Sequence, residues 1–169
     1  MTLARLAAGI TALACLVIGT LSLTGPPVPD ENWGTRGAVI NAVGLVAFAA
    51  TTLAVQLLPP LLALGRIGGM GCRIAQAGLA LMVVESAASQ IHEGNTLGPV
   101  FMLGLLLTLV GLILVAVDGL RRRRWLAPLP FVALLVAIGS GDHGGFLALT
   151  LTWAAIAAIN PGQSALATS

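Results

Sequence analysis

The 169-residue sequence contains no lysine and no tyrosine, and only 8% of its residues are charged. A soluble domain carries about a quarter charged residues, so a chain this poor in charge cannot keep its surface in water. Aromatic residues make up only 4% of the chain, and half of its arginines lie in one run. The sequence therefore argues against a soluble domain and against a nucleic-acid-binding protein.

The two cysteines are too few for a disulfide framework. Cys15 lies inside the first apolar segment, and Cys72 is in a part of the chain predicted to face the cytoplasm, where thiols stay reduced. We interpret both as small apolar core residues. Ala14 and Cys15 faintly match a lipoprotein cleavage site, but the apolar run continues to Leu23, which is long enough to span a bilayer. We therefore expect a retained helix.

Apolar segments dominate what is present, with 57% hydrophobic residues and a mean hydropathy of +1.00. Such segments must be helical in lipid, because an isolated strand would leave its backbone groups without partners. The period-two alternation of a barrel is absent. We predict an all-α polytopic bundle of six short helices that forms a single integral membrane domain over residues 1–169. The predicted helices are 3–23, 37–58, 73–91, 97–118, 125–140 and 145–160.

Proline and glycine mark the predicted breaks between the helices. Residues 25–32 contain three prolines, which fix φ and remove hydrogen-bond donors. Pro59 and Pro60 are predicted to end the second helix, residues 65–71 to form a glycine-rich linker, and residues 94–95 to form a turn. These breaks define the first four helices.

The last two predicted helices are short. Segments 125–140 and 145–160 each have about 16 residues, whereas a bilayer core of about 30 Å needs about 20. We favour two short spans, with a re-entrant hairpin over 125–160 as the alternative. Both arrangements leave the C-terminus on the same side of the membrane.

The arginines predict the orientation. With the N-terminus in the cytoplasm, seven of the eight arginines are cytoplasmic and only Arg36 is external, as the positive-inside bias requires. We therefore predict that both termini face the cytoplasm. Arginine without lysine is typical of a GC-rich bacterial genome, which suggests the bacterial cytoplasmic (inner) membrane. The seven cytoplasmic residues are Arg5, Arg66, Arg73, Arg121, Arg122, Arg123 and Arg124.

Small residues recur within the predicted helices. Gly104 and Gly111 are seven residues apart, and Ala75 and Gly78 are three apart. Small residues allow close helix packing in membranes. Because this chain is rich in alanine and glycine, such spacings also arise by chance, and no oligomer is inferred from them.

Glu85 is the most unusual residue, because it lies about 10 Å below the predicted outer end of the third helix. Intramembrane acids usually face the bundle interior and pair with another group. Ser89 and His92 extend the polar face of the same helix. Glu85 is either a structural residue, protonated or paired with a donor such as Arg36 or Asn41, or a functional proton carrier or ligand.

The two histidines, His92 and His143, both fall on the predicted outer side, and each is next to an acid. Two imidazoles and nearby carboxylates are the ligand types of a zinc site, so we consider a metal site built from His92, His143, Glu85 and Asp142. The spacing matches no metal-binding motif. No other cofactor is indicated, and a divalent metal is kept as a hypothesis.

Arg121, Arg122, Arg123 and Arg124, followed by Trp125, form a basic cluster at the predicted cytoplasmic surface. We interpret the cluster as a topology determinant with an interfacial aromatic residue. Attraction of anionic lipid is the alternative. On the outer side, residues 30–36 are interpreted as an interfacial anchor rather than a partner-recognition segment.

No motif specifies a reaction, so the sequence leans against an enzyme. The first functional hypothesis is a structural or accessory protein that binds a larger membrane protein within the lipid bilayer. The alternatives are a small proton-coupled transporter that uses Glu85, or an outer-face metal-binding protein or enzyme that uses His92 and His143.

Overall fold

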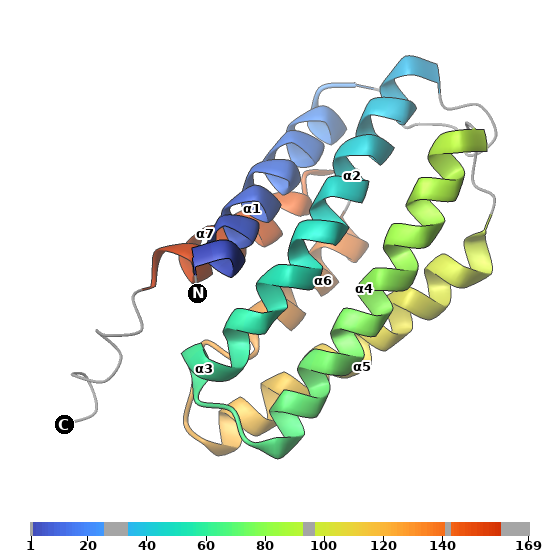
Figure 1. Cartoon of the computed structure of the whole chain (residues 1–169). Coiled ribbons are helices and arrows are strands. Elements are labelled where there is room, and N and C mark those ends of the chain that lie inside the picture. The colour runs from blue at the N-terminus through green and yellow to red at the C-terminus, as the bar shows by residue number, and fades with distance from the viewer. Residues whose placement is uncertain (1, 26–33, 93–96, 141–142, 160–169) are drawn as a thin grey trace.

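The computed structural model describes residues 2–25, 34–92, 97–140 and 143–159, and these are helical except for short connections (Figure 1). The described part contains no strand, which confirms the all-α prediction. The helices are α1 (Thr2–Leu23), α2 (Gly34–Ala54), α3 (Leu58–Leu62), α4 (Arg66–His92), α5 (Gly98–Arg121), α6 (Leu129–Gly139) and α7 (Phe146–Ala158), and a 3₁₀ turn (Val55–Leu57) joins α2 to α3.

Four helical stretches are long and apolar enough to cross a membrane. Many of their large hydrophobic side chains are exposed, including Leu3 and Leu13 of α1 and Leu106 of α5. Lipid is the solvent that accepts such a surface, which supports a transmembrane protein. The four stretches are Leu3–Leu23, Gly34–Leu62, Arg66–His92 and Gly98–Arg121.

The helices run alternately up and down through the bundle (Figure 1). α1 packs against α2 and α7, α4 packs against α2 and most extensively against α5, and α6 packs against α7. The start of α1, the end of α3 and the end of α5 therefore lie at one end of the bundle, which we call the arginine-rich end. The opposite end, where α2 begins, carries Arg36 and is called the Arg36 end.

α4 and α5 meet through glycines. A Cβ on Gly71 would lie 2.6 Å from the Gly111 carbonyl oxygen, and a Cβ on Gly111 would lie 2.5 Å from the Ala75 nitrogen. Real side chains do not tolerate such distances, so only glycine permits this contact between the two backbones.

The same contact corrects one prediction. Residues 65–71 were expected to form a linker, but α4 begins at Arg66, seven residues before the predicted start. Gly68 and Gly71 are buried in this first part of the helix, where they face α5. Tertiary packing thus outweighs the low helix propensity of glycine.

A second correction concerns Pro59 and Pro60, which do not end the second helical stretch. They occupy the first turn of α3, where a missing N–H is tolerated. The helix continues to Leu62 and ends at Ala63, which adopts a left-handed conformation with φ of 47°. The expected end was therefore a few residues too early.

α6 and α7 are shorter than predicted, and they begin at Leu129 and Phe146. At 1.5 Å per residue, their 11 and 13 residues extend only about 17 and 20 Å. The ends of α7 nevertheless lie beside opposite ends of α1. Gly144 packs against Leu23, and Arg5 Nη2 donates a hydrogen bond of 3.0 Å to the Ile159 carbonyl. The segment from 144 to 159 thus runs the length of α1, which favours two crossings over a re-entrant hairpin.

Candidate functional site: a cavity between the helices

A cavity of about 610 Å³ lies between the helices and is lined by α1, α2, α4, α5, α6 and α7. α2 and the first residue of the 3₁₀ turn that follows it contribute one continuous face, from Arg36 to Val55. This face covers 19 residue steps, or about 28 Å, nearly the thickness of a bilayer core. The volume lies within the range of pockets that bind small molecules, about 300–1,000 Å³.

The two ends of the cavity differ in polarity. Ser22, Arg36, Asn41, Glu85 and Ser86 line it towards the Arg36 end. Because helices in lipid present few polar groups, this concentration from three different helices marks the chemically distinct part of the cavity. The cavity is therefore amphipathic along its length.

The opposite end of the cavity is closed by packed hydrophobic residues. Val55 and Trp153 line the cavity and also belong to the main hydrophobic cluster. Leu58 and Val115, of the same cluster, have no exposed surface. The cluster forms an apolar floor on the side of the arginine-rich end.

Glu85 is buried in the cavity wall, with 6% of its surface exposed. It lies within α4, and the Ser89 hydroxyl, one helical turn further on, donates a hydrogen bond of 2.5 Å to Glu85 Oε1. An intramembrane carboxyl is expensive to keep out of water and is a candidate functional group for that reason.

Arg36 and Asn41, the predicted partners of Glu85, reach the same cavity. Asn41 Nδ2 donates hydrogen bonds of 2.9 Å to the Ser86 carbonyl and to Gln90 Oε1. These bonds use both amide hydrogens and tie α2 to α4. The Arg36 guanidinium donates to the carbonyl of Leu21 near the end of α1. The structure thus brings the three residues to one cavity and gives two of them interhelical roles.

The structure describes three of the four predicted metal ligands. His92, at the end of α4, and His143, just before α7, are both exposed. Asp142 lies outside the described residues. Within the described part of the chain, no three His, Cys, Asp or Glu side chains form a group that could hold a metal ion. The four-residue metal site stays a prediction.

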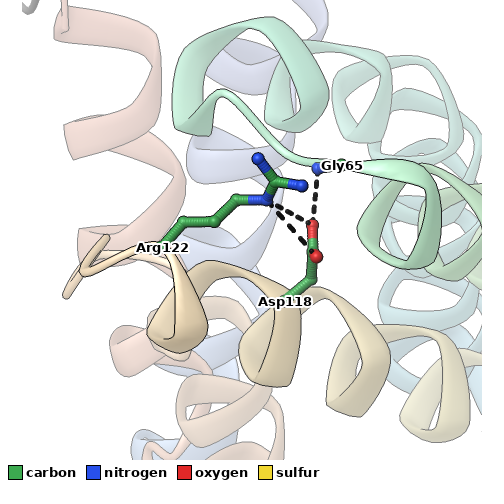
Figure 2. A network of polar contacts seen from close by, with 3 residues as sticks. All are labelled: Gly65, Asp118 and Arg122. Atoms are coloured by element: carbon green, nitrogen blue, oxygen red, sulfur yellow. Dashed lines mark hydrogen bonds and ion pairs between the residues drawn. The ribbon is translucent and has the colours of Figure 1, made fainter.

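The sequence did not reveal the role of Asp118, the second buried acid in the described chain. Figure 2 shows its carboxylate between Gly65 and Arg122 at the arginine-rich end. The Gly65 N–H donates a hydrogen bond of 2.6 Å to Asp118 Oδ2, and Arg122 Nε lies 3.4 Å from the same oxygen. A carboxylate at this point also complements the positive N-terminal end of α4. The sequence did contain one indication of this ion pair, because Asp118 and Arg122 are four residues apart and so lie on the same face of a helix.

The basic cluster lies at the arginine-rich end, where Arg121, Arg122 and Arg123 are exposed. Trp125 next to them is 78% exposed, as an interfacial aromatic residue would be. Lipid binding by this cluster stays a prediction.

Comparison with known protein families, with curated proteins and with solved structures found no match to this chain. Function is therefore inferred from the cavity and the residues that line it.

Proposed function

We propose that this chain is a small membrane protein that binds a lipophilic small molecule in the cavity between its helices. The observation that carries the proposal is an interhelical cavity of about 610 Å³ whose wall contains the buried carboxyl of Glu85. A mainly apolar pocket with a few convergent polar groups is the usual form of a small-molecule site. Glu85 supplies the polar group that selects and orients the ligand.

The proposal places both termini in the cytoplasm and the protein in a bacterial inner membrane. Its support is the gathering of seven arginines at one end of the bundle, which the positive-inside bias assigns to the cytoplasm. The polar end of the cavity, beside Arg36, then faces outwards. A ligand enters from the outer side of the membrane and rests its apolar part against the floor.

Gly44 allows a direct test. It lines the cavity, and a Cβ at this position would meet nothing within 4 Å, so Gly44→Leu fills the cavity without a steric clash at Cβ. Gly9 of α1 has the same open surroundings but is exposed and does not line the cavity, so Gly9→Leu is the matched control. Native mass spectrometry of protein extracted from its own membrane should show a retained small molecule, lost in Gly44→Leu and kept in Gly9→Leu.

Cys15 gives a second readout, since it lines the cavity and Cys72 does not. In a Cys72→Ser background, N-ethylmaleimide should alkylate Cys15 more slowly when Gly44→Leu fills the cavity. A protein that retains no small molecule, and whose Cys15 reacts equally fast with and without Gly44→Leu, would contradict the proposal.

The accessory function expected from the sequence stays a prediction, and the same variants separate it from ligand binding. A purely accessory protein would co-purify with a larger membrane protein and would keep its function in Glu85→Gln and in Gly44→Leu. Proton-coupled transport through Glu85 is instead an extension of the proposed function, because a carrier must first bind its ligand.

A further inference from the structure

We infer that the ligand is a lipophilic organic cation whose charge is balanced by the Glu85 carboxylate. This inference rests on the proposed function, since it names the chemical class that the same cavity takes. Three observations support it: the placement of the two charged residues in the cavity wall, the aromatic side chains that line the same cavity, and the apolar floor.

The charges of Arg36 and Glu85 are compensated differently. The Arg36 guanidinium donates to the Leu21 carbonyl and lies over Gly25, at the C-terminal end of α1. Carbonyls at a helix C-terminus favour a cation there. Glu85 lies seven residues before the end of α4, away from any helix terminus, and receives the Ser89 hydroxyl. A cationic ligand therefore complements the Glu85 carboxylate, whereas an anionic ligand would be repelled by it.

Two aromatic rings line the same cavity, deeper in the bundle than Glu85. The Phe48 and Phe101 ring centroids are 6.2 Å apart, with an edge-to-face angle of 63°. Because Gly78 contacts Gly104, Phe101 lies about one helical turn, or about 6 Å, further into the bundle than Glu85. Aromatic faces attract organic cations and accept their apolar groups. The carboxyl and the rings together fit a cation that carries a bulky hydrophobic body.

The test uses two probes of equal shape and opposite charge, tetraphenylphosphonium and tetraphenylborate, with the whole protein in nanodiscs of neutral lipid. Affinity is measured by equilibrium binding and by protection of Cys15 from alkylation in the Cys72→Ser background. Tetraphenylphosphonium should bind at least about tenfold more tightly than tetraphenylborate, because a partly buried charge pair is worth more than that factor. Glu85→Gln should remove this preference, whereas Glu85→Asp should keep it.

Asp118→Asn is the matched control, because Asp118 is the other buried acid in the described chain and does not line the cavity. It should leave the affinity for tetraphenylphosphonium within about twofold. The comparison of tetraphenylphosphonium with tetraphenylborate in the unaltered protein needs no variant. This comparison therefore tests the inference even if Glu85→Gln does not fold.

The outcomes separate the inference from the proposed function. If tetraphenylborate binds more tightly and Arg36→Gln abolishes that binding, the cavity binds ligands but the cationic class is wrong. A preference for tetraphenylphosphonium that persists in Glu85→Gln would overturn the role of Glu85. If neither probe binds, yet a retained molecule is lost in Gly44→Leu, only the cationic class fails. If no molecule is retained either, both proposals fail.

Discussion

Gly78 of α4 lies against the carbonyl oxygen of Gly104 of α5, so the two helices touch backbone to backbone. Gly71 and Gly111 make the equivalent contact two turns away. This seam positions the part of α4 that carries Glu85, and the geometry of the cavity depends on it.

Enlarging Gly78 should therefore destabilise the bundle. A Cβ on Gly78 would lie 2.5 Å from Thr108 Oγ1 and would also meet the backbone of α5. We expect Gly78→Ala to reduce the free energy of unfolding by about 1–3 kcal/mol, the usual effect of overpacking. Thermal unfolding in detergent measures the change. Gly69→Ala, on the same helix with nothing within 4 Å of the added Cβ, is the control and should not destabilise.

Loss of the Asp118 carboxylate should loosen the arginine-rich end. Asp118→Ala leaves the Gly65 N–H without its acceptor, and such a loss costs about 1–3 kcal/mol. Arg122→Gln should cost less than about 1 kcal/mol, because the Arg122 side chain is half exposed and its ion pair is screened. The free energies of unfolding of the two single variants and of the double variant give the coupling energy between Asp118 and Arg122. Equal effects of the two single variants would contradict the assigned role.

Asn41→Leu should weaken the contact between α2 and α4. It removes the hydrogen bonds to the Ser86 carbonyl and Gln90 Oε1, and a polar interhelical contact in a membrane is worth about 0.6–2 kcal/mol. Gln90→Leu removes only one of the two bonds and should have the smaller effect on the unfolding temperature. A stabilised Asn41→Leu protein would show that the amide is kept for the cavity and not for packing.

Orientation can be tested with single cysteines in a Cys15→Ser, Cys72→Ser background. Thr35 and Arg123 are both exposed, at the Arg36 end and at the arginine-rich end respectively. In intact cells, a membrane-impermeant maleimide should label Thr35→Cys and spare Arg123→Cys. The opposite pattern would invert the orientation and place the polar end of the cavity in the cytoplasm.

The course of α6 and α7 predicts a further labelling result. His143 is exposed and precedes Gly144, which packs against Leu23 at the end of α1 that lies towards the Arg36 end. His143→Cys should therefore react from outside as fast as Thr35→Cys. A re-entrant hairpin would bury this turn within the bilayer, and labelling would then be absent.

The sequence predicted the helical class and most helix positions, because apolar length alone determines which segments fit a membrane. It misplaced the start of α4 and the end of the α2–α3 stretch. Glycines normally break helices and prolines normally end them, and only the contact with α5 and the position in a first turn reverse these rules. Boundary errors thus arose where tertiary context outweighed local propensity.

The charged and polar residues of the candidate site were predictable, but its aromatic residues and its shape were not. The burial cost of an isolated acid singled out Glu85, and helical spacing pointed to Ser89. Phe48 and Phe101 carried no signal, because an aromatic residue in an apolar helix is ordinary until its neighbours across the bundle are known. The cavity depends on how α2, α4 and α5 are arranged in space, which hydropathy does not report.

The packed floor of the cavity has a mechanical consequence. Val55 begins the 3₁₀ turn that joins α2 to α3, and it is 1% exposed within the main hydrophobic cluster. Short 3₁₀ segments inside long helices often act as hinges. Movement of α3 about this turn would separate Val55 and Leu58 from the main hydrophobic cluster, so the floor of the cavity can open only if part of that cluster comes apart.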